Sequence, residues 1–121
     1  MKLLYNPLKN PEIYTKGWGH ELWVHNDEKY CGKLLVLLKG KRCSLHFHVK
    51  KHETFCIIRG LVQIELIHAN GKKETLTMPP GAAIEIPPGL VHRFTGIEDS
   101  EIAEFSTQHF EEDSYRIERG D

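Results

Sequence analysis

Short apolar segments alternate with turn-forming residues along most of the chain. Each segment has four to eight residues, the usual length of a β-strand. No segment has the apolar spacing of an amphipathic helix, and only the tail, Phe110–Arg119, could hold a helical turn. The pattern predicts nine strands, at Glu21–His25, Lys33–Leu38, Cys43–His48, Thr54–Arg59, Leu61–His68, Lys73–Met78, Ala82–Ile86, Val91–Thr95 and Ile102–Thr107.

The segments between the predicted strands are rich in glycine, proline and asparagine. Asn70-Gly71 is typical of a β-hairpin, because both residues tolerate the positive φ of a type I′ turn. Closely spaced short strands without a helix indicate an all-β fold, an antiparallel sandwich or barrel. A chain of 121 residues fits one such domain.

Residues 1–20 differ from the rest of the chain. Pro7, Pro11, Gly17 and Gly19 stand among polar residues there, which favours an extended arm over a helix. We therefore expect an N-terminal arm over 1–20 and the β-barrel domain over 21–121.

Composition narrows the function classes. Apolar residues make up 40% of the chain and charged residues 27%, as in an average soluble domain. The net charge is -1, with a basic first half and an acidic second half. Because both halves belong to one domain, their charges mix in space and form no basic face, so we expect no nucleic-acid partner. The longest apolar run, Leu34–Leu38, is too short to span a membrane. Without a signal-peptide pattern at its start, the protein is expected in the cytoplasm, and its three scattered cysteines are expected to remain thiols.

Four residues predict a metal site. His46 and His48 are two apart on a predicted strand, so their side chains leave the same face. Glu53 begins the next strand, where a hairpin would place its carboxylate beside the imidazoles, and His92 heads a later strand. Such a set suits one divalent ion of zinc, manganese, iron, cobalt or nickel. For His46 and His48 alone, a polar stripe on a solvated strand is the alternative.

The spacing of these residues resembles the two signatures of the cupin superfamily. The first signature is matched by Gly40, His46, His48, Glu53 and Gly60, and the second by Gly81, Pro87, Gly89 and His92. The resemblance implies a double-stranded antiparallel β-barrel, the cupin or jelly-roll fold, with a metal held by His46, His48, Glu53 and His92. Gly96 departs from the pattern, since many cupins have Asn there.

Two flanking segments are similar to the cupin domain of type II mannose-6-phosphate isomerases. They are Lys16–Glu21 before the barrel and Asp113–Asp121 at its exit. This resemblance implies an aldose–ketose isomerase for a sugar or sugar phosphate. A divalent ion would stabilise the enediolate that forms as a proton moves between C1 and C2.

Three residues are candidates for the catalytic work. Glu104 and His109 lie on or just after the last predicted strand and are candidate bases. Alternation does not fix the direction of Glu104, because Ala103 and Phe105 are both apolar, and a solvated edge glutamate is the simpler interpretation. Arg116 matches the arginine of the family's exit motif and is a candidate for binding a phosphate or sugar hydroxyls.

Other functions remain open from the sequence. The same ligands with iron could serve a dioxygenase, and a small cupin could bind a metal or metabolite without turnover. The expected partner is a small molecule, a carbohydrate on the isomerase interpretation. Resemblance to small cupins also predicts a homodimer formed through the N-terminal arm.

Overall fold

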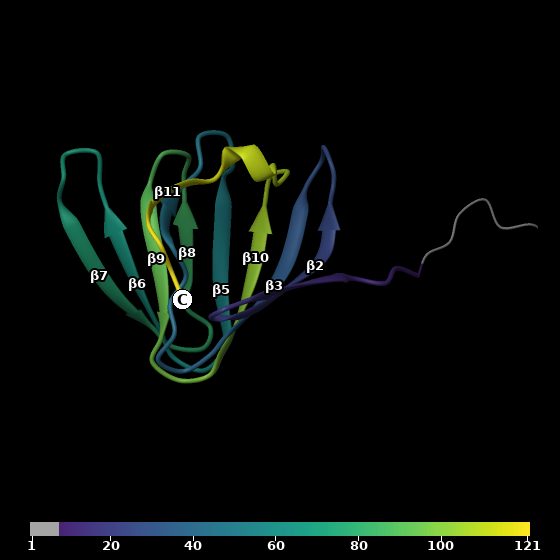
Figure 1. Ribbon diagram of the computed structural model, residues 1–121, viewed down its shortest axis with the longest axis horizontal. Coiled ribbons are helices and arrows are strands. Elements are labelled where there is room, and N and C mark those ends of the chain that lie inside the picture. Colours follow the sequence, from purple (N-terminus) through teal and green to yellow (C-terminus); the bar gives the residue numbers. More distant parts are fainter. Residues whose placement is uncertain (1–7) are drawn as a thin grey trace, which may run out of the picture.

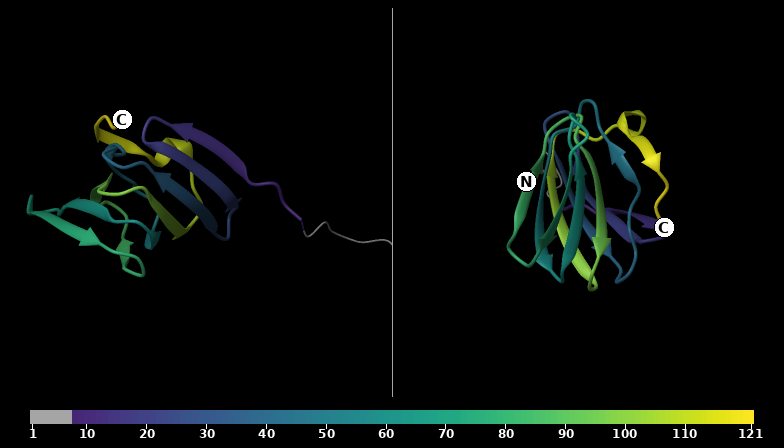
Figure 2. Two further views of the ribbon diagram at one scale, coloured as in Figure 1. Left: turned by 90° about the horizontal axis from the view of Figure 1, so that it is seen from below. Right: turned by 90° about the vertical axis from the view of Figure 1, so that its left-hand side faces the viewer.

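Two antiparallel β-sheets face each other in the computed structural model, which describes residues 8–121 (Figures 1 and 2). One sheet has six strands in the order β1-β2-β3-β10-β5-β8, and the other has five in the order β11-β4-β9-β6-β7. The strands are β1 (Glu12–Lys16), β2 (Gly19–Asn26), β3 (Cys31–Leu37), β4 (Leu45–Phe47), β5 (Glu53–Arg59), β6 (Val62–Ile67), β7 (Lys73–Met78), β8 (Ala83–Ile86), β9 (Val91–Gly96), β10 (Ser100–Ser106) and β11 (Tyr115–Glu118). The predicted all-β, double-stranded barrel of one domain is confirmed.

The core lies between the inner faces of the two sheets. Phe55 and Ile57 of β5 point inward from one sheet, and Val62, Ile64 and Leu66 of β6 point inward from the other. These buried residues alternate with less buried neighbours, as expected for strands with one face on a core. Each such side chain contributes about 1.5–3 kcal/mol when fully buried. The apolar core therefore fills the space between the two sheets, and polar side chains enter the barrel at its open end.

The hairpin between β6 and β7 differs in type from the prediction. Gly71 has a φ of +84°, but Asn70 keeps a negative φ, so the turn is not type I′. The Gly71 N–H instead donates to the His68 carbonyl at 2.8 Å, and the His68 N–H donates to the Lys72 carbonyl at 2.9 Å. This is a three-residue loop in which glycine alone takes the left-handed conformation.

The predicted N-terminal arm contains a strand. β1 pairs with β2 along its whole length, from Glu12 opposite Trp23 to Lys16 opposite Gly19. Residues 1–7 of the arm lie outside the described residues, and the proposed boundary at residue 20 falls inside β2. The division into an arm and a barrel stays a prediction. Gly17, in the β1–β2 turn, lies close against Asp121. A side chain would not fit there, because a Cβ at Gly17 would lie 2.3 Å from the Asp121 carbonyl carbon.

The tail contains the predicted helical turn and a strand that the pattern did not predict. The turn is a 3₁₀ helix, η1 (Glu111–Asp113), and β11 follows it and pairs with β4. Figure 1 shows this segment, in yellow, crossing the open end of the barrel. The C-terminal segment thus closes one side of the space between the sheets.

The structure also bears on the three cysteines and on membrane-spanning segments. Cys31, Cys43 and Cys56 are free thiols, as their scattered spacing predicted. Across residues 8–121, no helix has the length and apolar character needed to cross a bilayer.

Candidate metal centre

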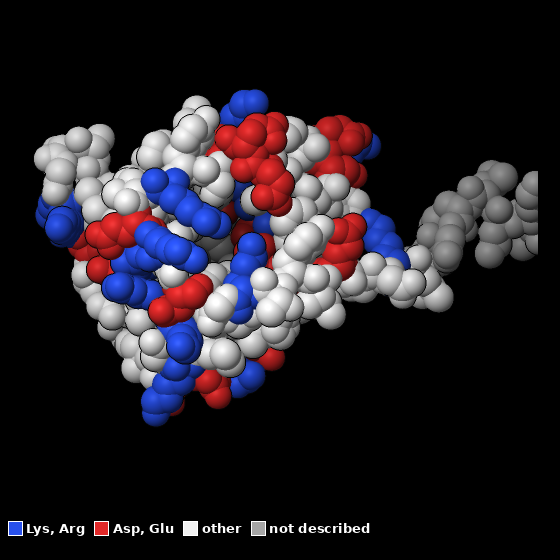
Figure 3. Space-filling model, in the orientation of Figure 1, with Lys and Arg blue, Asp and Glu red and all other residues white. Residues whose placement is uncertain are grey.

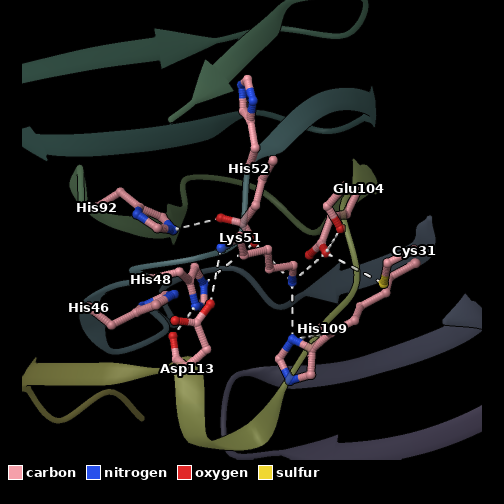
Figure 4. Close-up of polar contacts among 12 residues, drawn as sticks. Cys31, His46, His48, Lys51, His52, His92, Glu104, His109 and Asp113 are labelled. Atoms are coloured by element: carbon pink, nitrogen blue, oxygen red, sulfur yellow. Dashed lines mark hydrogen bonds and ion pairs between the residues drawn. The ribbon is translucent and has the colours of Figure 1, made fainter. Parts of the chain in front are cut away.

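Three histidine side chains converge at the open end of the barrel (Figure 4). His46 lies on β4, His48 directly follows that strand, and His92 lies on β9. His46 and His92 are register partners on neighbouring strands, so their side chains leave the same face of the sheet. One ligand atom from each of the three histidines can be chosen so that all lie within 4.8 Å of one another.

Backbone carbonyls set the tautomer of all three rings. The Nδ1 atoms of His46, His48 and His92 lie 2.8, 2.9 and 2.9 Å from the carbonyl oxygens of Ser44, Asp113 and Leu90, respectively. Because a carbonyl only accepts, each Nδ1 carries the hydrogen and each Nε2 keeps its lone pair. Metal-binding histidines are usually oriented in this way.

Glu53 approaches the histidines from the opposite sheet. Its Oε1 atom lies 3.5 Å from His48 Nε2, and its Oε2 atom lies 3.3 Å from His92 Nε2. The sequence predicted this proximity through a hairpin, and that route is wrong, because β4 and β5 belong to different sheets. The loop after His48 crosses between the sheets and brings the carboxylate across the barrel.

The four side chains fit a divalent ion. Among the described residues, neither His92 Nε2 nor Glu53 Oε2 makes a hydrogen bond, although both atoms are buried. Two ligand atoms that each lie about 2.1 Å from an ion, at angles of 90 to 110°, are separated by about 3.0–3.4 Å. The 3.3 Å between Glu53 Oε2 and His92 Nε2 falls within this range, whereas the 3.5 Å between Glu53 Oε1 and His48 Nε2 lies just beyond it.

The protonation states also suit metal binding. Burial, followed by the neighbouring His92, lowers the pKa of His46 to about 3, and burial lowers the pKa of His48. Burial opposes ionisation of Glu53, yet the Lys51 ammonium, 3.1 Å from its Oε1 atom, holds the pKa of this carboxyl below its usual range. Neutral imidazoles and an ionised carboxylate are the forms that bind metal.

Buried charged and polar side chains form one wall of the barrel interior, from Glu53 along the six-stranded sheet. Lys51 Nζ lies 3.1 Å from Glu53 Oε1, 2.7 Å from Glu104 Oε2 and 3.1 Å from His109 Nδ1 (Figure 4). Burial disfavours the ammonium, but the Glu104 and Glu53 carboxylates outweigh this and raise the pKa of Lys51 above its usual range. Lys51 is therefore a cation that links the candidate metal ligands to two of the predicted catalytic residues.

Glu104 is buried, so the interpretation as a solvated edge residue is wrong. It shares the inward face of β10 with Ile102, two residues earlier, while Phe105 faces outward. The Ser106 hydroxyl donates to Glu104 Oε2 at 2.8 Å, and Lys51 compensates the buried charge. The carboxylate can face the cavity because these partners stabilise it there.

His109 faces two ammonium groups and also contacts the ring of His48, with ring centroids 6.4 Å apart. Its Nδ1 atom lies 3.1 Å from Lys51 Nζ and 3.3 Å from Lys33 Nζ, and ammonium groups only donate. Nδ1 must then accept, and a neutral ring carries its hydrogen on Nε2. Burial, followed by Lys33 and Lys51, lowers the pKa of His109 to about 3. The ring is therefore a neutral partner of the lysines.

A cavity of about 630 Å³ joins these groups to the surface. Arg116 lines it from β11, where it is the register partner of His46, and its side chain is exposed. Lys16, Glu111 and Arg119 also line the cavity, and Figure 3 shows basic and acidic side chains around a hollow on this face. The opening is thus polar, whereas the opposite end is lined by core residues such as Leu37 and Phe94.

Comparison with known families agrees with the geometry. A family model described as "Cupin" matches residues 19–116, which is most of the chain. The chain belongs to the cupin family. No curated protein sequence matches this cupin.

Solved structures similar to this cupin share its fold at low sequence identity. The capsular polysaccharide assembling protein CapF from Staphylococcus aureus superposes with a TM-score of 0.81 at 16% identity, covering 93% of this chain and 33% of CapF. Oxalate decarboxylase from Bacillus subtilis, in its structure at pH 4.6, gives a TM-score of 0.79 at 16% identity, covering 93% of this chain and 33% of that protein. The cupin therefore spans about a third of each of these chains.

Two residues of this centre, Lys51 and Asp113, were not found by sequence reasoning. Asp113 of η1 is buried, and its carboxylate accepts hydrogen bonds from the backbone N–H groups of Val49, Lys50 and Lys51, at 2.9 to 3.2 Å. Its own carbonyl accepts from His48. Asp113 thus shapes the loop between β4 and β5 and orients one histidine. Sequence reasoning used Asp113 only as the start of the exit segment Asp113–Asp121 and gave it no structural role.

Proposed function

We propose that this cupin binds one divalent metal ion and isomerises a sugar or sugar phosphate between its aldose and ketose forms. The observation that carries the proposal is the convergence of three oriented Nε2 atoms and one carboxylate on a cavity that also contains a second buried carboxylate, Glu104. His46, His48, His92 and Glu53 would hold the ion. When bound, the ion supplies a Lewis acid that stabilises negative charge on adjacent sugar oxygens.

The remaining chemistry falls to residues of the chain. Moving a proton between C1 and C2 requires a base, and we assign this role to Glu104. It pairs with Lys51 at 2.7 Å, and a carboxylate can accept a proton from carbon. His109 would orient Lys51, because its Nδ1 already faces the two lysines. Arg116, at the exposed side of the cavity, would bind a phosphate or hydroxyl groups of the substrate.

The donor set leaves zinc, manganese, iron, cobalt and nickel as candidates for the ion. Among the similar structures, oxalate decarboxylase is described with manganese(II) centres, and CapF is described with the inhibitor 3-isopropenyl-tropolone. A tropolone has two adjacent oxygens, like the C1 and C2 oxygens of a sugar. We therefore expect tropolone to bind the metal-loaded cavity of this cupin in competition with substrate.

The test is exchange of substrate hydrogen with deuterated water, followed by NMR on a panel of aldoses, ketoses and their phosphates. The protein is loaded in turn with each candidate ion. We expect exchange at C1 or C2 that falls by about 100-fold or more in Glu104→Gln, because general-base catalysis contributes about this much. Metal binding should survive in that variant. Glu101→Gln is the matched control, since Glu101 lies on the same strand in a partly exposed ion pair with Arg59.

The same experiment separates the competing functions. Full exchange in Glu104→Gln contradicts its role as base. Oxygen consumption by iron-loaded protein would favour the dioxygenase alternative. Metal and carbohydrate binding without any exchange would favour a non-enzymatic binding protein.

A further inference from the structure

Lys51 has all of its hydrogen-bonding capacity directed at three named groups. An ammonium has three N–H donors. Its three neighbours are Glu53 Oε1 at 3.1 Å, Glu104 Oε2 at 2.7 Å and His109 Nδ1 at 3.1 Å. The Lys51 side chain is only 2% exposed. It is therefore a fixed group of the cavity wall, with no donor left for solvent.

This contact makes the two oxygens of Glu53 unequal. Oε1 accepts from the Lys51 ammonium at 3.1 Å and lies 3.5 Å from His48 Nε2, whereas Oε2 is buried without a hydrogen bond, 3.3 Å from His92 Nε2. A carboxylate oxygen that faces an ammonium is a weaker metal donor, because its charge is already shared. Oε2 is thus the oxygen available to an ion beside the three histidines.

We propose that Lys51 is a positioning residue that limits Glu53 to one metal-binding oxygen and so keeps two coordination positions open for a ligand with adjacent oxygens. The proposal rests on the metal centre of the proposed function. Three histidine nitrogens and one glutamate oxygen account for four positions of a six-coordinate ion. If Glu53 bound through both oxygens, only one position would remain, and a two-oxygen substrate could not bind the ion.

Lys33 offers a matched control on the same wall. Its side chain is also buried, and its Nζ also faces His109 Nδ1, at 3.3 Å. Its other neighbours are Glu21 Oε1, at 3.3 Å, and the ring of Trp23, 4.0 Å away. Its described contacts do not include Glu53. Lys33→Met therefore removes an equally buried ammonium and leaves Glu53 in place.

The experiment counts the exchangeable waters on bound Mn²⁺ by electron paramagnetic resonance in ¹⁷O-enriched water. We expect two waters in the unmodified protein, two in Lys33→Met and one in Lys51→Met. Tropolone affinity for the Mn²⁺-loaded protein should fall at least about tenfold in Lys51→Met alone, as is typical when a group that orients a metal ligand is lost. Two waters in Lys51→Met, or one in the unmodified protein, overturns the proposal.

A second measurement on the unmodified protein covers the case in which Lys51→Met does not fold. Infrared difference spectra between metal-free and Mn²⁺-loaded protein report how the carboxylate binds. A wide separation of the two carboxylate stretches is expected for one bound oxygen, and a narrow separation overturns the proposal. Neither measurement uses a sugar, so an inactive isomerase assay leaves their outcome standing. If Mn²⁺ does not bind to the unmodified protein, both this proposal and the proposed function fail.

Discussion

Asp113 shows how one residue can control the candidate metal centre from outside it. Burial opposes its ionisation, but the N–H groups of Lys50, Val49 and Lys51 outweigh that and lower the pKa of its carboxyl. We predict that Asp113→Ala weakens metal affinity by about 10- to 100-fold, because the loop between β4 and β5 and the orientation of His48 both depend on it. Competition with a chromophoric chelator measures the change.

The control for this prediction is Glu112→Ala. Glu112 is an exposed carboxylate on the same 3₁₀ turn and should leave metal affinity unchanged. Equal affinity in Asp113→Ala and the unmodified protein would show that the loop holds its shape without the carboxylate.

For individual residues, the sequence predicted which side chains lie close together at the candidate metal centre, but not which residues support them. The spacing of the two signatures predicted that four side chains lie near one another, those of His46, His48, His92 and Glu53, and they do. Metal binding by these residues stays a prediction. The support from Asp113 could not be predicted, because its bonds to the 49–51 loop join positions 62 to 64 residues apart. Only the folded chain brings such pairs into contact.

Among the elements, β11 is held by its pairing with β4 and by one buried arginine of the nearby strand β9. Arg93 donates to the Cys43 carbonyl at 2.9 Å, to Glu118 Oε1 at 3.0 Å and to the Arg119 carbonyl at 3.1 Å. We predict that Arg93→Met lowers the free energy of unfolding by about 1–3 kcal/mol, because the Cys43 and Arg119 carbonyls and the Glu118 carboxylate all lose a charged donor. Chemical denaturation measures the loss.

Arg59→Met provides the comparison for that loss. Arg59 forms an exposed ion pair with Glu101, so its replacement should cost no more than about 1 kcal/mol. Hydrogen exchange should also quicken across β11 in Arg93→Met. A variant that is as stable as Arg59→Met would mean that backbone pairing with β4 suffices to hold the strand.

The two strands that sequence reasoning missed, β1 and β11, share one property. All of their residues are exposed, so neither shows the alternation of buried and exposed positions that reveals a strand. Backbone pairing at the sheet edges, and Arg93 in the case of β11, supplies what the pattern lacks. The other nine strands were predicted to within a few residues.

For the whole molecule, the outer face of the six-stranded sheet carries a row of apolar side chains. Successive register pairs place one apolar or cysteine residue from each strand in a row across the sheet: Ile13, Leu22, Leu34, Ala103, Cys56 and Ala83. Phe105 and Ile58 flank this row and are 61% and 52% exposed. A contiguous apolar surface of this kind commonly marks a protein–protein interface.

This face turns the sequence-based expectation of a homodimer into a specific prediction. We expect analytical ultracentrifugation at micromolar concentration to give twice the chain mass of 14.0 kDa. Phe105→Glu should shift the protein to monomer, because a charge within an apolar interface would lose its hydration without gaining a partner. Leu76→Glu on β7 of the other sheet should remain dimeric.

A monomer in the unmodified protein contradicts the homodimer. A dimer that persists in Phe105→Glu would instead direct attention to the exposed edge of β1, where pairing uses the backbone and tolerates the substitution.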